Sequence, residues 1–129
     1  MAKNKRTAFF ISDGTGITAG SLGGLLAHFP ETEFDQIRIP FTDSIQKVED
    51  AQKRVANIKM MTGSRPIVIM SIGNEILRNE LKAVDAYYID LFDSFIHPLG
   101  VELNEPALTR PGVSPVSYTH LTLPTNVAV

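Results

Sequence analysis

A short loop rich in glycine and hydroxyl residues is the part of the sequence best suited to chemistry. It follows an apolar run, Thr7–Ser12, and precedes a stretch with helical periodicity. A helix start offers unpaired N–H groups, and glycine lets the backbone approach a ligand closely, so this arrangement favours an anion such as phosphate. The candidate ligand residues are Ser12, Asp13, Gly14, Thr15, Gly16 and Thr18.

Two other interpretations of this loop stay open. Gly14 and Gly16 are also what a tight strand-to-helix turn needs, with no ligand at all. Together with Ala19 they also fit the Gly-x-Gly-x-x-Ala pattern of a dinucleotide site, with Asp43 as the acidic residue after the second strand. Asp13 argues against that site, because a carboxylate beside the glycines would repel a pyrophosphate.

The sequence contains no phosphate loop of the Gly-x-x-x-x-Gly-Lys-Ser/Thr type, because no lysine follows a glycine. One arginine is a further candidate for phosphate. Arg78 lies on the helix after the third expected strand, so it can face the same crevice as the glycine loop. Capping or surface roles account for the other polar candidates, and we expect no metal site. These candidates are His28, Asp85, Asp90, Asp93 and His97.

Length and composition exclude several classes of protein. The chain has 129 residues, which suffices for one domain. A net charge of −2 gives no electrostatic support for nucleic-acid binding. The absence of cysteine excludes disulfides and thiolate metal sites, and no apolar run reaches the roughly 20 residues that cross a bilayer. We therefore expect a cytoplasmic protein.

Strand and helix patterns alternate along the chain. Apolar or alternating runs predict strands, and spacings of three and four predict helices. The order β-α-β-α-β-α predicts an α/β domain of three layers with a mostly parallel sheet. A further β-α unit at 86–96 and one bent helix over 75–97 stay open as alternatives. The expected strands are Thr7–Ser12, Phe34–Phe41, Pro66–Ile72 and Ala86–Ile89. The expected helices are Ile17–Phe29, one that begins at the capping box of Asp43 and Gln46 and ends at Gly63, one capped by Asn74, and Leu91–Ile96, capped by Asp90.

Taken together in order, several blocks resemble the phosphoenolpyruvate synthetase regulatory protein family, a relative of the pyruvate, phosphate dikinase regulatory protein. The resemblance covers about residues 7–112, and the Ser-Asp-Gly-Thr-Gly-Ile-Thr block is its most specific part. Gly20 departs from the glutamate common at that position, so the role of that acidic side chain is not carried over. The blocks are Phe9–Ala19, Ile37–Phe41, Arg65–Ile72, Glu75–Arg78, Asp90–Leu99 and Arg110–Gly112.

The resemblance implies a bifunctional enzyme. It would inactivate its dikinase by ADP-dependent phosphorylation of a threonine near the catalytic histidine. It would reactivate it by phosphate-dependent removal of that phosphoryl group, which releases pyrophosphate. Its partner would be phosphoenolpyruvate synthetase (pyruvate, water dikinase) or pyruvate, phosphate dikinase, and its full-length form a possible homodimer. The family's nucleotide is held by a phosphate loop in the second half of the protein, so no catalytic residue is assigned in this chain.

The resemblance also implies a division of the chain. We expect an arm at 1–6 without regular structure, an α/β domain at 7–100 and a linker at 101–115 leading to a missing phosphate-loop domain. Val116–Thr125 reads as a translated sequencing adapter, so 116–129 is expected to be a non-native tail. Such a fragment is expected to be inactive and to bind no cofactor tightly.

Two further hypotheses compete with a truncated regulatory kinase. The Gly14–Thr18 loop can instead serve a free-standing module that binds phosphate or a nucleotide, or the domain can dock a dikinase without catalysis. A ligand-dependent shift in melting temperature distinguishes the first of these from the second.

Overall fold

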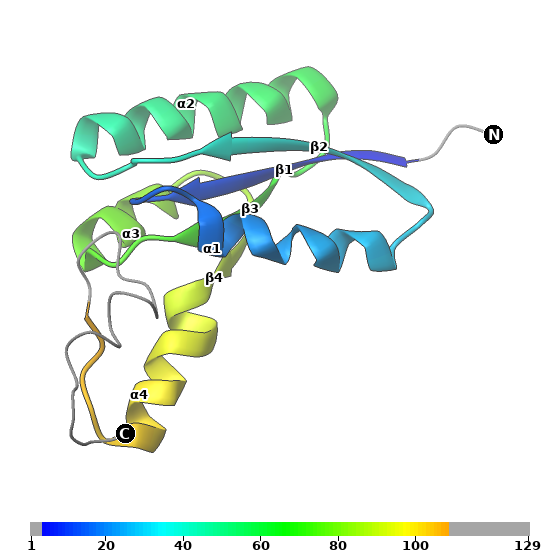
Figure 1. The fold of residues 1–129 in the computed structure, drawn as a ribbon. Coiled ribbons are helices and arrows are strands. Elements are labelled where there is room, and N and C mark those ends of the chain that lie inside the picture. Colours follow the sequence, from blue (N-terminus) through cyan, green and yellow to red (C-terminus); the bar gives the residue numbers. More distant parts are fainter. Residues whose placement is uncertain (1–3, 109–129) are drawn as a thin grey trace.

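A parallel four-stranded sheet forms the centre of the molecule, in a computed structural model that describes residues 4–108 (Figure 1). Its strands lie in the order β2-β1-β3-β4, and each pair of neighbours is parallel. The predicted α/β class with a parallel sheet is therefore confirmed. The strands are β1 (Asn4–Ser12), β2 (Thr32–Ile39), β3 (Ile67–Ser71) and β4 (Tyr87–Asp90).

Helices cover both faces of this sheet and complete three layers. One face packs against α2 (Ile45–Thr62) and α3 (Glu75–Leu81). The other packs against α1 (Ile17–Gly20) and the 3-10 helix η1 (Ser21–His28). After β4 the chain forms a π-helix, η2 (Phe92–Ile96), which continues into α4 (His97–Leu103) and leads away from the sheet (Figure 1). In the part of the chain described, no helix is long and apolar enough to span a membrane.

Strand β1 is buried on both faces, as a central parallel strand should be. Phe9 and Ile11 point to the core beneath α2 and α3, whereas Ala8 and Phe10 point to the core beneath α1 and η1. All four are at most 2% exposed. The strand order places β1 in the middle of the sheet, so the loop that follows it is held by packing from two directions.

The chain boundaries differ from the prediction at two places. Asn4–Arg6 belong to β1 and pair with Thr32–Phe34 of β2, so these residues are not part of an irregular arm. Their side chains are polar or charged, so no apolar pattern predicted the strand here, although the backbone pairs with β2. Helix α4 runs to Leu103, past the expected domain boundary at residue 100. Residues 109–115 of the expected linker and the whole expected adapter tail, 116–129, lie outside the described residues.

The predicted first helix is shorter and tighter than expected. Only Ile17–Gly20 is α-helical, and Ser21–His28 forms a 3-10 helix that ends before Phe29. Gly20, Gly23 and Gly24 explain the difference, since each glycine costs about 1 kcal/mol in an α-helix relative to alanine. The alternative of one bent helix over 75–97 is wrong, because β4 pairs with β3 in that stretch.

The helix ends test the predicted caps. Ser44, rather than Asp43, is the N-cap of α2, and its side chain accepts a hydrogen bond from the Lys47 N–H. Asp43 instead forms an exposed ion pair with the Lys47 ammonium. The prediction of a capping box with Gln46 was therefore wrong by one residue. Gly63 in the left-handed conformation and Asn74 as the N-cap of α3 are confirmed.

Candidate functional site

The most suitable place for a ligand is the carboxyl edge of the sheet between β1 and β3. The chain leaves β1 toward α1 on one face, and it leaves β3 toward α3 on the opposite face. Such a divergence between neighbouring parallel strands opens a crevice where α/β proteins bind ligands. The predicted loop, Ser12–Gly16, lies on one side of this crevice and Ile72–Asn74 lies on the other.

Backbone hydrogen bonds fix the loop after β1. The Gly14 N–H donates to the Ser12 hydroxyl at 3.0 Å, which closes a tight turn. The carbonyl oxygens of Ser12 and Gly14 accept hydrogen bonds from the N–H groups of Thr42 and Phe41, both at 2.8 Å. The segment after β2 therefore holds the loop from the side. Phe41 has a φ of 57°, a strained conformation for an aromatic residue, and its side chain is 53% exposed.

Asp13 spans the crevice. Its N–H donates to the Ser71 carbonyl at 3.2 Å, and its carboxylate accepts a hydrogen bond from the Gly73 N–H at 2.9 Å. Burial raises the pKa of Asp13, and the nearby Asp43 carboxylate adds to the rise, while the backbone hydrogen bonds oppose it. Asp13 therefore joins the ends of β1 and β3.

The remaining loop residues present hydroxyl groups at the surface. Gly16 has a φ of 87° and precedes α1, a conformation that glycine adopts without strain. Thr15 and Thr18 are exposed. Because α1 has only four residues and continues as a 3-10 helix, the helix dipole gives little support to the expected anion site. Contact of this loop with a ligand stays a prediction.

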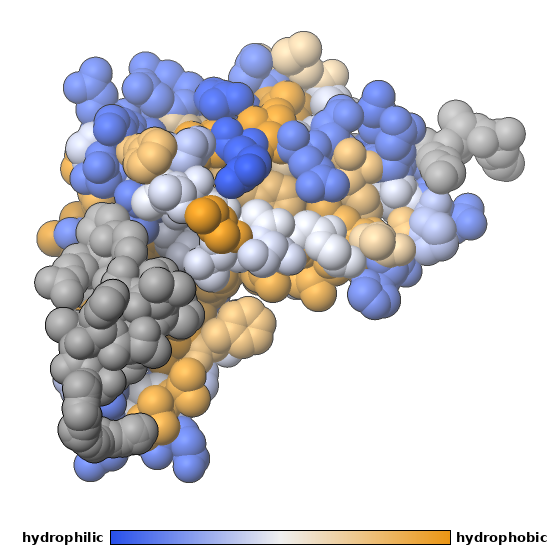
Figure 2. All heavy atoms as spheres, in the orientation of Figure 1, coloured by the Kyte–Doolittle hydropathy of each residue, from blue (hydrophilic) through white to orange (hydrophobic). Residues whose placement is uncertain are grey.

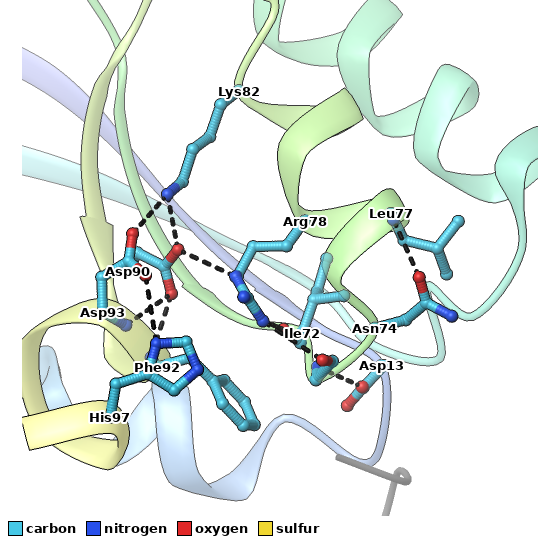
Figure 3. Close-up of polar contacts among 11 residues, drawn as sticks. Asp13, Ile72, Asn74, Leu77, Arg78, Lys82, Asp90, Phe92, Asp93 and His97 are labelled. Carbon is cyan, nitrogen blue, oxygen red and sulfur yellow. Dashed lines mark hydrogen bonds and ion pairs between the residues drawn. The ribbon is translucent and has the colours of Figure 1, made fainter. Parts of the chain in front are cut away.

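Arg78, the predicted phosphate contact, is buried behind the crevice with 5% exposure. One terminal nitrogen donates to the carbonyl oxygens of Ile72 and Gly73, both at 3.1 Å, and Nε lies 3.4 Å from the Asp90 carboxylate (Figure 3). The guanidinium also lies over the Phe92 ring, 5.4 Å from its centroid. These contacts give Arg78 a structural task, since it holds the backbone whose Gly73 N–H binds Asp13.

Asp90 organises a cluster of charges at the end of β4. Its carboxylate is 5% exposed, caps η2 by accepting the Phe92 N–H at 2.9 Å, and lies 2.6 Å from the Lys82 ammonium. Burial by itself would lower the pKa of Lys82, but the carboxylates of Asp90 and Asp93 outweigh it and raise that pKa. The Lys82 ammonium in turn lowers the pKa of Asp93, which lies 3.5 Å from His97. Asp90 is thus a cap, as predicted, and an ion-pair partner as well.

One arginine near the loop was not singled out from the sequence. Arg38 on β2 pairs with Phe10 in the sheet register, and its guanidinium lies 3.5 Å from the Thr15 carbonyl. It borders a hollow of about 400 Å³ lined by Phe10, Ile17, Gly20, Gln36 and Arg38. The alternation of 34–38 could have revealed it, because Phe34, Gln36 and Arg38 share the sheet face that α1 covers.

The residues of the dinucleotide pattern lie in the following places. Ala19 is fully buried in the core, and Asp43 lies at the start of α2 rather than at the end of β2. Among residues 4–108, no three His, Asp or Glu side chains are grouped as metal ligands.

Comparison with known proteins decides the family. A family described as Kinase/pyrophosphorylase matches residues 8–120. The chain belongs to the kinase/pyrophosphorylase family. Its match extends through the described domain and covers the first residues of the segment expected to derive from an adapter, whose origin stays a prediction.

Curated relatives in this family carry the name "Putative phosphoenolpyruvate synthase regulatory protein". The protein from Methylobacillus flagellatus is 51% identical over 110 residues, which are 85% of this chain and 41% of that protein. The protein from Aromatoleum aromaticum is 46% identical over 101 residues, or 78% and 36% of the two chains. That from Hahella chejuensis is 42% identical over 111 residues, or 85% and 41%. The chain therefore spans about two fifths of the length of these kinase/pyrophosphorylase relatives.

Proposed function

We propose that this chain is part of a regulatory enzyme that phosphorylates and dephosphorylates phosphoenolpyruvate synthase. The observation that carries the proposal is the family match over residues 8–120, which is supported by relatives up to 51% identical that are named for regulation of that synthase. The names favour the synthase as partner over the related pyruvate, phosphate dikinase.

The proposed function comprises two different reactions. In the first, the terminal phosphoryl group of ADP passes to a threonine hydroxyl of the synthase, and AMP leaves. In the second, inorganic phosphate attacks the phosphothreonine, the threonine hydroxyl is restored and pyrophosphate leaves. Both reactions need a cradle for phosphate oxygens and a positioned nucleophile, because phosphoryl transfer depends mainly on positioning and charge stabilisation.

This domain's share of the site is the loop between β1 and α1. The loop is held by hydrogen bonds from Phe41 and Thr42, and Asp13 fixes it to Gly73. That rigidity suits a surface that must position a second group, and the exposed hydroxyls of Thr15 and Thr18 face outward from it. We propose that Ser12–Thr18 contacts phosphate or the target protein, and that the nucleotide loop belongs to the part of the relatives that this chain lacks.

A phosphotransfer assay tests the proposed function. The chain, and a version extended by its genomic continuation to the length of the relatives, are each incubated with ADP and purified phosphoenolpyruvate synthase. We expect the extended protein to phosphorylate a single threonine and to abolish synthase activity, and this chain alone to do neither. A synthase variant with valine at that threonine is the control. If the extended protein transfers no phosphoryl group, the proposed function is wrong.

A further inference from the structure

Arg38 carries a charge that its surroundings leave unneutralised. Its side chain is exposed, and among residues 4–108 it forms no ion pair with a carboxylate. The element that packs against it offers none, since the sequence between Asp13 and Glu31 contains no Asp, Glu, Lys or Arg. On the adjacent strand its register partner is Phe10. Within the described part of the chain, its guanidinium forms one hydrogen bond, the long one to the Thr15 carbonyl.

The guanidinium stands at the edge of a hollow rather than on a convex surface. Phe10 and Ile17 supply apolar walls to this space of about 400 Å³, and Gln36 adds an amide. Glycines border this space, and at Gly23 there is little room for a side chain beside Gln36. A Cβ at Gly20 would lie 3.8 Å from the Arg38 guanidinium carbon, and one at Gly23 would lie 3.3 Å from the Gln36 amide oxygen. Figure 2 shows a pale band of intermediate hydropathy over α1 and η1, bordered by hydrophilic side chains on the side of β2.

The chemistry of this hollow selects an oxyanion. A planar guanidinium presents parallel N–H donors that match two oxygens of a phosphate, and an uncharged surrounding leaves their attraction uncancelled. The volume lies within the range of small-ligand sites.

We propose that the hollow beside Arg38, which we call the Arg38 hollow, binds the phosphoryl group of inorganic phosphate or of a nucleoside diphosphate. This inference rests on the proposed function for the identity of the anion, and it assigns that anion a position on this domain. The proposal replaces Arg78 by Arg38 as the phosphate contact. Arg78 is buried and bonded to Asp90 and to backbone carbonyls, whereas Arg38 is exposed and lies beside Thr15 and Gly16 of the loop.

The test is a titration of the ¹⁵N-labelled 129-residue chain with inorganic phosphate, ADP and adenosine, followed by NMR. Arg38→Gln removes the charge from the hollow. Arg54→Gln removes the same charge from an exposed site on α2, across the sheet, and controls for net charge. We expect phosphate and ADP, but not adenosine, to shift the amides of Gly16, Gly20 and Gly23. Affinity should fall about tenfold in R38Q and less than about twofold in R54Q, as for loss of one charge-assisted hydrogen bond.

Each outcome bears on one of the two proposals. Three results would overturn the inference: an equal loss of affinity in R38Q and R54Q, chemical-shift changes at other amides, or no binding of either anion to the unaltered chain. Binding of phosphate but not ADP would assign the site to the free anion; binding of both would assign it to the shared phosphoryl group. The phosphotransfer assay on the extended protein is a separate test. If R38Q leaves phosphotransfer activity unchanged, the proposed function is supported and phosphate binding in the Arg38 hollow is contradicted. If the extended protein is inactive but binds phosphate, and R38Q removes that binding, the Arg38 hollow is supported and the proposed function is contradicted.

Discussion

At the scale of single residues, Asp13 connects the predicted loop to the rest of the sheet edge. Its carboxylate accepts the Gly73 N–H, and the Gly73 carbonyl accepts from Arg78. Arg78 in turn pairs with Asp90 at the end of β4. Side chains therefore join the ends of three strands through Gly73. The position of the loop depends on residues that lie sixty or more positions from Asp13 in sequence.

The raised pKa of Asp13 predicts a pH dependence of stability. The folded state binds the Asp13 proton more tightly than the unfolded state, so this group's contribution is complete below its unfolded pKa of 3.8 and is lost as the pH rises through the folded pKa. Asp13→Asn keeps an acceptor for the Gly73 N–H but does not ionise. We expect the stability of D13N relative to the unaltered chain to increase over that rise in pH, measured by urea unfolding. Asp50→Asn, on exposed α2, controls for the loss of charge. A stability difference that falls with pH would contradict the burial of Asp13.

The buried ion pair predicts a larger effect. Arg78→Met leaves Asp90 buried without its guanidinium partner and frees the carbonyls of Ile72 and Gly73. We expect the free energy of unfolding to fall by about 2 kcal/mol, because two buried carbonyls lose their donor and Asp90 loses one of its two cationic partners. The Lys82 ammonium, 2.6 Å from Asp90, still compensates that carboxylate. Arg54→Met, at an exposed site, should cost less than about 0.5 kcal/mol. Equal effects of the two substitutions in chemical denaturation would show that Arg78 is not buried as described.

At the scale of elements, Ser44 and Asp43 are the two neighbouring candidates for the N-cap of α2, and substitutions distinguish them. Ser44→Ala removes the acceptor of the Lys47 N–H and should destabilise the fold by about 1 kcal/mol. Asp43→Ala removes only an exposed ion pair with Lys47, worth about 0.3–0.5 kcal/mol. Thermal unfolding of both variants measures the difference. A larger loss in D43A than in S44A would restore Asp43 as the cap.

The order of the elements could be predicted from the sequence because each buried strand is a continuous apolar run. Pro66–Ile72 and Thr7–Ser12 predict two central strands, and Gly63 and Asn74 predict the helix ends between them. The 3-10 helix could not be predicted from periodicity, since Leu22, Leu25 and Leu26 fit an α-helix equally well. β4 was ambiguous for a similar reason: Tyr87–Asp90 is short, and only its pairing with β3 identifies it.

The candidate site was predicted in part. The position of the Ser12–Gly16 loop at the carboxyl edge follows from strand alternation and is found there. The partners of its side chains come from distant parts of the chain, which local spacing does not give. Arg78 and Arg38 both follow this rule: their roles depend on Asp90 and on Gly20, which lie in other elements.

At the scale of the whole molecule, helices on both faces of the sheet support its carboxyl edge, and α4 leads away from the sheet (Figure 1). The chain covers about two fifths of its relatives' length. We propose that this domain positions phosphate or the target while the remaining part of the longer protein holds the nucleotide. That division explains how a kinase/pyrophosphorylase chain can contain no Gly-Lys phosphate loop.

The most direct test is the phosphate-dependent reactivation of the synthase. Phosphoenolpyruvate synthase phosphorylated on its threonine is incubated with inorganic phosphate and the protein extended to the length of its relatives. The account predicts that synthase activity returns and that one pyrophosphate forms for each phosphothreonine lost. Recovery of activity with release of inorganic phosphate alone would indicate a simple phosphatase, and no recovery at all would contradict the assignment to this reaction.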